Sequence, residues 1–436
     1  MVEKSWHDAN GLDSSLGNPL DFSANSGELA ERMSRLPTPR GVTPKRPIAL
    51  KPRGLTKTHK RRSRPAFDCI ALLLQGGGAL GAYQAGVYEA LAEAELAPDW
   101  VVGISIGSIN AAIIAGNPPE TRVAKLRNFW EAVTSSPLEL NGDFGFIWRG
   151  NAAREFINRV SAATTVISGA RGFFQPRIPN PWFQPPGTIE ATSYYDTTPL
   201  KATLETLIDF DRINSEHAEI RLSVGAAEVR SGNLTYFDTS THTIKLEHIM
   251  ASGALPPGFP AVEIEGEHYW DGGLVSNTPL QWVAANRPPD TLAFQVDLWN
   301  AQGQLPSTLA EVATRQKEIQ YSSRTRAFTD LFKYLTKVHG SLANLLEQLP
   351  DDLKQSEDAK FLASVARRRV HNIVHLIYRP SGYEGDSKDY EFSRRSMEDH
   401  WRAGYHDAVH TLRHDEVLER PTKETIVTFD LARGGD

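Results

Sequence analysis

Ser105 lies at the centre of the pentapeptide GISIG, flanked by Gly103 and Gly107. The apolar residues 100–104 lead into it, and a helical pattern follows as far as Gly116. A G-x-S-x-G pattern between a strand and a helix is typical of a sharp turn that exposes the serine hydroxyl. The glycines leave steric room for the turn, and the helix dipole favours negative charge beside it. Ser105 is therefore a candidate nucleophile for acyl transfer.

A second glycine-rich turn follows the apolar run of residues 70–74. It contains Gly76, Gly77 and Gly78, with Gly81 three residues further on. Its backbone N–H groups can hold an oxyanion, as acyl transfer requires. The same G-x-G-x-x-G pattern also fits a dinucleotide-binding turn, which needs an acidic residue about 20 residues further on, at the end of the next strand. This chain has glycine and serine there, so the sequence favours the oxyanion role.

The segment between the two turns has apolar residues at helical spacing, which predicts a strand–helix–strand unit. Such a crossover is right-handed and places both turns at the carboxyl edge of a parallel sheet, where ligands bind in open α/β sheets. We expect further strands at residues 220–229, 262–264, 268–270, 291–298 and 373–378, and a hairpin that pairs residues 234–237 with 243–246.

An α/β-hydrolase with a Ser, Asp and His triad would use the same serine. In that fold several elements separate the oxyanion loop from the nucleophile, whereas a single strand–helix–strand unit separates Gly77 from Ser105. The chain has 13 histidines, so their number does not decide between a triad and another mechanism. His268 lies on a predicted strand, and we interpret it as structural.

The composition is that of a globular protein, with 436 residues of which 40% are hydrophobic and 23% charged. No apolar run of about 18 residues predicts a membrane span, and the N-terminus lacks the pattern of a secretory signal. The single cysteine, Cys69, cannot form an internal disulfide and is expected to be a small core residue. These features favour a cytoplasmic protein, with peripheral contact at the membrane as an option.

The N-terminal residues 1–65 differ in charge from the rest of the chain. From Lys45 to Arg64 there are nine basic residues and no acidic one, although the formal net charge of the whole chain is -6. This composition predicts a disordered basic tail. The tail is suited to contact an anionic membrane surface, and the alternative is a solvated tail with no partner. No nucleic-acid-binding motif accompanies it, so we expect no nucleic-acid partner.

Residues 169–187 hold five prolines interleaved with Phe173, Phe174, Trp182 and Phe183. Such a segment cannot form a regular helix or a central strand, so it predicts a long loop that carries aromatic side chains. We interpret it either as a lid or interfacial docking patch, or as a loop whose aromatic residues pack on its own domain.

The sequence beyond residue 300 is mostly helical in pattern. Nine apolar residues between Phe328 and Leu349 keep a three-to-four spacing, which predicts a helix with a core-facing stripe. A second helix is expected at residues 392–414. Three histidines on its solvated face have a spacing that a metal site allows, but no carboxylate accompanies them, so we expect no metal. The packing face of this helix is expected to comprise Met397, Trp401, Tyr405, Ala408 and Leu412.

Four sequence blocks occur in the order QGGGALGAY, GISIGSINAA, ASGALPPGFP and DGGLVSNTPL. They resemble the four signature blocks of the patatin-like phospholipase family, and the resemblance spans residues 68–280. Agreement of four blocks in order and spacing makes the match highly specific. Residues 169–211 and the segment DYEFSRRSMEDHWRAGYHDA also resemble a bacterial patatin-like subgroup with a C-terminal extension of unknown role.

The resemblance implies a three-layer α/β/α core at residues 66–300, with a mainly helical extension at residues 301–436 packed on it. It also implies a serine acyl hydrolase that cleaves lipid carboxylic esters with no cofactor. Ser105 would be the nucleophile and Asp271 its base, and the oxyanion hole would be formed by Gly76, Gly77 and Gly78. Glycines that support these motifs are Gly81, Gly103, Gly107, Gly272 and Gly273.

A carboxylate is a weak base for a serine hydroxyl, so burial must raise the basicity of Asp271. One residue departs from the pattern of the family, because many members carry a basic residue where Leu80 stands. This weakens the case for a charged phospholipid over a neutral ester. The alternative to an enzyme is a catalytically weak patatin-fold scaffold at membranes or lipid inclusions.

Overall fold

The computed structural model describes residues 58–60, 63–134, 151–286, 288–366, 369–380, 384–385, 387–422 and 426–431. From Arg53 to Asp436 the chain forms one compact unit. Most of the predicted basic segment from Lys45 to Arg64 lies outside the described ranges. Within those ranges, no helix has the length and apolar character needed to cross a bilayer.

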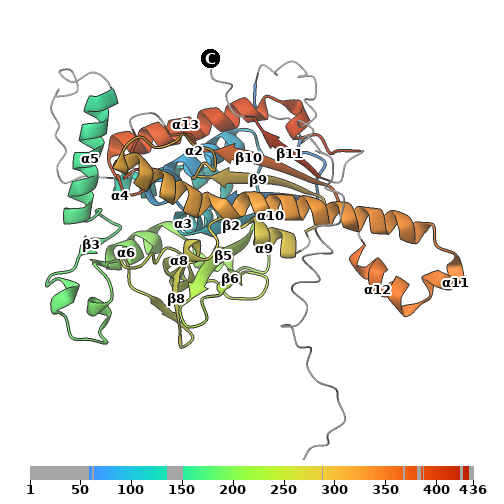
Figure 1. Cartoon of the computed structure of the whole chain (residues 1–436), viewed down its shortest axis with the longest axis horizontal. Coiled ribbons are helices and arrows are strands. Elements are labelled where there is room, and N and C mark those ends of the chain that lie inside the picture. Colours follow the sequence, from blue (N-terminus) through green and yellow to red (C-terminus); the bar gives the residue numbers. More distant parts are fainter. Residues whose placement is uncertain are drawn as a thin grey trace, which may run out of the picture. The chain divides into compact units, whose positions relative to one another are not determined.

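The described strands form a nine-stranded sheet in the order β11-β10-β9-β1-β2-β5-β8-β7, with β6 paired to β5 (Figure 1). Neighbours from β11 to β5 are parallel, whereas β6, β7 and β8 join in antiparallel pairs. The strands are β1 (Cys69–Leu74), β2 (Trp100–Ile104), β5 (Arg221–Glu228), β6 (Leu234–Asp238), β7 (Val262–Ile264), β8 (Glu267–Asp271), β9 (Thr291–Asp297), β10 (His371–Ile377) and β11 (Ile426–Asp430).

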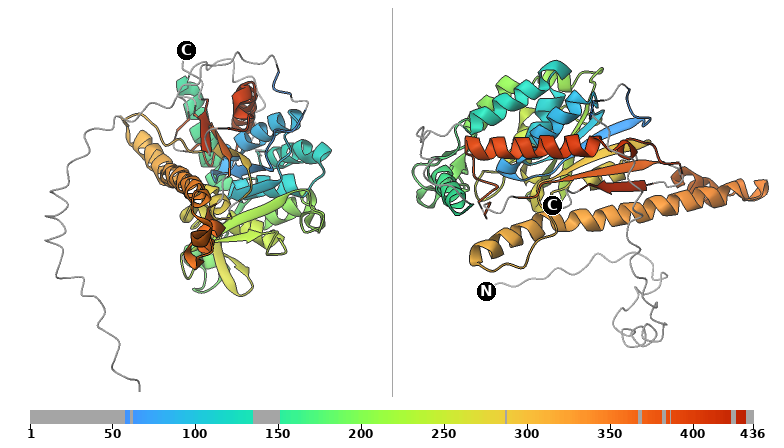
Figure 2. Two further views of the ribbon diagram at one scale, coloured as in Figure 1. Left: turned by 90° about the vertical axis from the view of Figure 1, so that its right-hand side faces the viewer. Right: turned by 90° about the horizontal axis from the view of Figure 1, so that it is seen from above.

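Helices cover both faces of this sheet, so the fold is the expected three-layer α/β/α architecture. Alternate residues of β1 point to opposite faces, and Leu72 and Leu74 join one buried cluster while Ala71 and Leu73 join the other. Figure 2 shows α13 and α10 on opposite sides of the strands. The first face is covered by α2 (Ala82–Glu93), α3 (Ile106–Ala115), α4 (Pro119–Val133) and α13 (Arg394–Leu412), and the second by α9 (Leu280–Ala285) and α10 (Leu309–Glu347).

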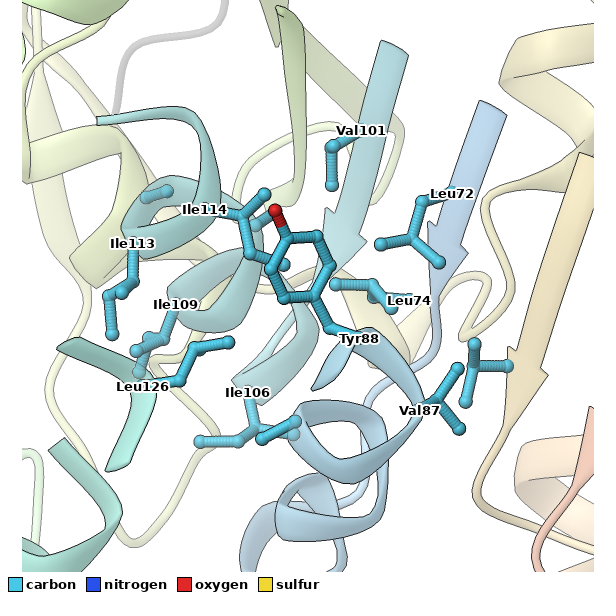
Figure 3. Close-up of a cluster of buried hydrophobic side chains, with 14 of the residues drawn as sticks. Leu72, Leu74, Val87, Tyr88, Val101, Ile106, Ile109, Ile113, Ile114 and Leu126 are labelled. Carbon is cyan, nitrogen blue, oxygen red and sulfur yellow. The ribbon is translucent and has the colours of Figure 1, made fainter. Parts of the chain in front are cut away.

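The larger buried cluster holds the two strands of the predicted crossover against their helices (Figure 3). Leu72, Leu74 and Val101 from β1 and β2 pack against Tyr88 of α2 and Ile109 of α3. Every residue of β1 and β2 is buried, as expected for parallel strands covered on both faces. The turn after each strand therefore begins from a fixed position at the sheet edge.

Smaller elements surround this core. A two-stranded sheet pairs β3 (Gln175–Pro176), which lies in the predicted proline-rich segment, with β4 (Tyr195–Asp196), which follows that segment. The remaining helices are α5 (Asn151–Ser168), α6 (Thr198–Leu207), α7 (Phe210–Ile213), α8 (Leu246–Ser252), α11 (Asp351–Lys354) and α12 (Glu357–Val365).

One prediction about secondary structure is wrong, and one about packing holds only in part. Residues 243–246 form no strand, and β6 pairs with β5 instead, because a short turn brings the chain directly back along β5. The apolar stripe of α10 faces the core only in part, since Phe332 packs against the smaller buried cluster whereas Leu331, Leu335 and Val338 are exposed. This helix extends past the edge of the sheet, so the sheet cannot cover its far end (Figure 1).

The region beyond residue 300 contributes to the main sheet as well as to its helical layers. β10 pairs with β9, and β11 pairs with β10, so this region completes one side of the sheet.

The predicted packing face of α13 is buried at Met397, Trp401, Ala408 and Leu412. Cys69 is buried in β1, as predicted. The division of the chain at residue 300 stays a prediction.

Candidate active site

Ser105 lies between β2 and α3 in a strained turn, with φ 56° and ψ −128°. A side chain rarely adopts this positive φ, so neighbouring contacts must hold it. A Cβ atom at Gly103 would lie 2.4 Å from the carbonyl oxygen of Gly107, and one at Gly107 would lie 2.3 Å from that of Leu74. Both glycines are therefore required by the close approach of backbone on either side of the serine.

Ser252 stabilises this turn from α8. Its hydroxyl accepts a hydrogen bond from the Ser105 N–H at 2.9 Å and donates one to the Gly225 carbonyl at 2.6 Å. The side chain of Ser252 is fully buried, so the strained turn is connected to β5 through a fixed polar contact. Sequence reasoning missed Ser252, although it lies inside the block ASGALPPGFP.

Asp271 ends β8 and lies beside Ser105, although the two residues are far apart in the chain. The Ser105 hydroxyl lies close enough to the Asp271 carboxylate to lower its pKa, and its Oδ1 accepts a hydrogen bond from the Gly273 N–H at 2.7 Å. The residue is buried, with 2% of its surface exposed. A buried carboxylate in contact with a serine hydroxyl is suited to remove its proton.

Burial is the largest influence on the pKa of Asp271 and raises it to about 6, while the hydrogen bonds from Ser105 and Gly273 oppose the rise. Burial disfavours the charged form because the carboxylate loses its hydration. The base is consequently stronger than an ordinary aspartate, yet it is ionised at neutral pH. The geometry thus supplies the increase in basicity that a Ser-Asp pair requires.

The glycine turn after β1 lies at the same site. The Gly76 N–H donates to the Asn277 carbonyl at 3.4 Å, and the Ala79 N–H donates to the Asp389 carbonyl at 2.8 Å. The N–H groups of Gly77 and Gly78 donate to no described residue of the chain. Of the three glycines considered for the oxyanion, the structure therefore leaves Gly77 and Gly78 with open donors, while the Gly76 donor already has an acceptor.

The carbonyl oxygen of Gly76 is held on two sides. It accepts a hydrogen bond from Asn277 Nδ2 at 2.9 Å and another from Trp299 Nε1 at 2.9 Å. Gln75, the residue before Gly76, is also held in place, because its Oε1 accepts a hydrogen bond from the Leu298 N–H at 2.6 Å. Sequence reasoning missed the roles of these three side chains, although Gln75 and Asn277 lie in blocks that carry the family resemblance.

Ser105, Asp271 and the glycine turn line one cavity of about 340 Å³. Its walls are mainly apolar and aromatic, and none of the described residues that line it is a histidine, lysine or arginine. His268 lies on β8 and His375 contacts Asp297 at 3.6 Å, so neither is part of this lining. The arrangement offers a serine, a carboxylate and open N–H donors, without an imidazole. Apolar and aromatic side chains of the lining include Phe173, Phe174, Tyr195, Phe259, Trp299, Tyr321 and Phe392.

The proline-rich loop is divided between two environments. Phe173 and Phe174 are buried and line the cavity. By contrast, the exposed fractions of Ile178, Trp182 and Phe183 are 91%, 81% and 81%. Two aromatic residues of the loop therefore pack on the domain, whereas a lid or docking role for the exposed part stays a prediction.

Residues beyond 300 also line the cavity. Tyr321 comes from α10, while Asp389, Tyr390 and Phe392 precede α13. The Tyr321 carbonyl accepts a hydrogen bond from Gln75 Nε2 at 3.2 Å. No group of three or more potential metal ligands occurs in the part of the chain that the structure describes.

Comparisons with known proteins find two family models that match this chain. The family model described as Patatin-like phospholipase matches residues 72–283, and a second, described as Patatin phospholipase, matches residues 319–424. Mouse Patatin-like phospholipase domain-containing protein 6 is 37% identical over 97 residues, which are 21% of this chain and 7% of that protein. Triacylglycerol lipase SDP1L of Arabidopsis thaliana is 42% identical over 52 residues, 12% of this chain and 6% of that protein.

The matched segments are thus short fractions of these curated relatives. Among solved structures, VipD from Legionella pneumophila is similar with a TM-score of 0.34 and 14% identity, covering 86% of this chain and 71% of that one. The first family model covers the motifs that contain Ser105 and Asp271, and the second lies beyond residue 300. The chain belongs to the patatin-like phospholipase family.

Proposed function

We propose that this chain is a serine acyl hydrolase that cleaves lipid carboxylic esters through Ser105, Asp271 and an acyl-enzyme. The observation that carries the proposal is the buried Asp271 carboxylate, which lies beside the Ser105 hydroxyl in the cavity that Gly77 and Gly78, with their open N–H groups, also line. Family membership and the lipase relative support the broader function of lipid hydrolysis.

In the first half-reaction the Ser105 oxygen attacks the ester carbonyl carbon while its proton moves to Asp271. The oxyanion that forms accepts hydrogen bonds from the N–H groups of Gly77 and Gly78. When the intermediate collapses, the ester C–O bond breaks and the departing alcohol takes the proton from Asp271. The product that remains is an ester between Ser105 and the acyl group.

Water completes the cycle by attacking the acyl carbonyl, with Asp271 accepting a proton from that water. The same N–H groups hold the second oxyanion, and the proton returns from Asp271 to the Ser105 oxygen as the fatty acid leaves. Each half-reaction therefore ends with Asp271 ionised. Asp271 acts as base and then as acid in both halves, so no histidine is needed for proton transfer.

The lining of the cavity favours an acyl chain attached to a neutral ester. Its walls are mainly apolar, and no cationic side chain occurs among the described residues that line it. Leu80, which stands where many family members have a basic residue, is fully buried in the core. An anionic headgroup would consequently find no cationic side chain at the site.

We extend the proposal to the way in which substrate arrives, and commit to aggregated neutral lipid as the partner. Val166 both lines the cavity and is half-exposed, and Ile167 beside it is exposed. Pro257 lines the cavity and also borders a hollow beside the exposed Trp182. A large exposed apolar area at the entrance to an acyl site fits a lipid surface.

Contact of the Lys45 to Arg64 segment with anionic membrane stays a prediction, as does cytoplasmic localisation.

A fluorophosphonate probe tests the catalytic proposal, because it reacts with activated serines. Mass spectrometry of the labelled full-length protein is expected to find the probe on Ser105. The Ser105→Ala variant is expected to remain unlabelled and to unfold at the same temperature as the wild type. Absence of labelling in the folded wild type would instead favour the alternative, a catalytically weak scaffold at membranes or lipid inclusions.

A further inference from the structure

Two pairs of adjacent charged residues connect α10 to the segment that precedes α13. Lys317 Nζ lies 2.8 Å and 3.0 Å from the two carboxylate oxygens of Asp389. Lys388 Nζ lies 2.8 Å from Glu318 Oε1. Each side thus supplies one cation and one anion, and the two ion pairs cross. We call these four residues the crossed clamp.

One of the two ion pairs is almost completely removed from solvent. The exposed fractions of the Lys388 and Glu318 side chains are 2% and 10%. Glu318 also accepts from Arg315 at 3.1 Å, and Lys388 lies 5.3 Å from the ring centroid of Trp299. A buried ion pair contributes little net stability compared with apolar packing, but the loss of one partner leaves an uncompensated charge. Such pairs are best understood as fixing one particular arrangement of two segments.

The clamp fixes the position of a backbone carbonyl that contacts the glycine turn. The Asp389 carbonyl accepts a hydrogen bond from the Ala79 N–H at 2.8 Å. A Cβ atom at Gly78 would lie 2.1 Å from that same carbonyl oxygen. Gly78 also has a φ of +55°, which disfavours other residues. The backbone of Asp389 is therefore packed directly against one of the two glycines with open N–H groups.

A second contact from α10 reaches the same turn from its other end. Tyr321 lies one helical turn after Lys317, and its carbonyl accepts from Gln75 Nε2. Gln75 immediately precedes the glycine turn, so α10 contacts one end of the turn through Tyr321 and the other through the clamp. Segments outside the Ser105 and Asp271 motifs consequently contact both ends of the turn that carries the N–H groups of Gly77 and Gly78.

We infer that the crossed clamp is a positioning device for the oxyanion turn, and that the C-terminal region is an obligatory part of the active site. This inference rests on the proposed function. With the Ala79 N–H engaged by Asp389, the turn is held where the two preceding residues, Gly77 and Gly78, line the cavity. The clamp residues touch no substrate; they act on the reaction through the backbone of Asp389.

The experiment uses Lys388→Met and the charge-exchanged double variant Glu318→Lys/Lys388→Glu in the full chain. Hydrolysis of a short soluble ester gives kcat and KM, and thermal unfolding reports on the fold. Loss of one oxyanion donor costs roughly 10²–10³ in kcat, so displacement of the turn is expected to lower kcat by about 10²-fold in Lys388→Met, with KM within about threefold. The double variant is expected to recover kcat to within about tenfold of the wild type.

A boronic acid that forms a tetrahedral adduct with serine provides a readout that a merely structural role would not change. Lys388→Met is expected to bind it more weakly in proportion to the loss of kcat, because the adduct depends on the oxyanion donors. The matched control is Lys354→Met, which removes the partly exposed Lys354–Asp351 pair on α11 and is expected to leave kcat and boronate affinity unchanged.

Folded Lys388→Met with wild-type kcat and boronate affinity would overturn the inference. A folded double variant as impaired as the single one would also contradict it. If Lys388→Met does not fold, the same measurements on Lys317→Met decide, because that lysine is a third exposed. Failure of the proposed function is distinguishable, since Ser105→Ala would then retain wild-type turnover whatever the clamp variants do.

Discussion

Two walls of the same cavity are built in contrasting ways. The C-terminal wall, formed by Tyr321, Asp389 and Tyr390, is held by the crossed clamp and by hydrogen bonds to the glycine turn. The loop wall, formed by Phe173 and Phe174, is held by aromatic contacts with ring centroids 5.5 Å apart, and its loop continues into exposed side chains. Directional polar contacts fix atoms, whereas apolar contacts fix only proximity.

The difference indicates that the two walls have different roles. The chemistry needs N–H donors held within a fraction of an ångström, and the wall with polar contacts adjoins them. Substrate entry needs an apolar surface with less defined geometry, which the loop side offers. The walls meet at Phe392, whose ring centroid lies 5.5 Å from that of Phe173 and 6.1 Å from that of Phe174.

The largest effect is expected at the residues between the walls. Ser105→Ala and Asp271→Asn should each lower the turnover of a short acyl ester by at least about 10⁴-fold, because one removes the nucleophile and the other its base. Steady-state kinetics, with circular dichroism as a control for folding, checks both. Near-wild-type turnover in either folded variant would contradict the proposed mechanism. It would also contradict the different roles assigned to the C-terminal wall and the loop wall.

The pH dependence follows from the raised pKa of Asp271. The base must be ionised in the free enzyme, so kcat/KM is expected to fall about tenfold for each pH unit below about 6. Initial rates between pH 4.5 and 8 on a neutral ester check this limb. If Lys388→Met shows the same decrease of kcat/KM below pH 6, with a lower kcat/KM above it, the clamp acts on the oxyanion donors and leaves the base unchanged.

The same pKa predicts the effect of Asp271 on stability. A carboxyl with a folded pKa near 6 holds its proton more tightly in the native than in the unfolded state, so native stability falls as pH rises from about 4 to about 6 and stays lower above. The buried charge then costs about 3 kcal/mol. Asp271→Asn is expected to remove this cost at pH 7.5 and to show no gain at pH 4, as measured by urea unfolding.

A smaller effect is expected from the outer part of the loop wall. Trp182→Ser/Phe183→Ser should weaken binding to triacylglycerol emulsion droplets by about tenfold or more, because each large apolar side chain contributes about 1.5–3 kcal/mol when buried. Turnover of a short soluble ester should not change. Ser105→Ala protein serves for the binding measurement, which keeps docking separate from hydrolysis.

Phe361→Ser is the matched control for the loop variant, because Phe361 on α12 is also exposed, at 68%. Its binding to the droplets is expected to equal that of the wild type. Equal weakening in both variants would mean that apolar exposure anywhere on the protein promotes adsorption, and the loop wall would lose its assigned role.

The smallest effects are expected at the histidines. Substituting His268, His371 and His375 one at a time should leave turnover within about tenfold, because none of them lines the cavity. Burial lowers the pKa of His371 to about 4, so this residue is neutral in β10 at neutral pH. A loss of about 10⁴-fold in any one of them would instead indicate a Ser-His-Asp triad.

The sequence by itself determined the local features of this protein. The turn around Ser105 and the glycine turn after β1 were predictable because backbone sterics at adjacent residues create them, and the structure shows the close approaches at Gly103 and Gly107. The burial of β1 and the packing face of α13 were predictable because a continuous apolar run and a helical apolar period both reflect burial. Asp271 was reached through family resemblance, since no local pattern connects it to Ser105.

Only the tertiary structure decided which distant groups meet. The apolar periodicity of α10 predicted a helix but not what covers it, and Leu331 and Leu335 are exposed. The crossed clamp carried no sequence signal, because lysines and acids at the surface of any helix look the same as Lys317 and Glu318. Their partners, Lys388 and Asp389, are brought to them by the insertion of β10 beside β9, a long-range pairing that no local propensity encodes.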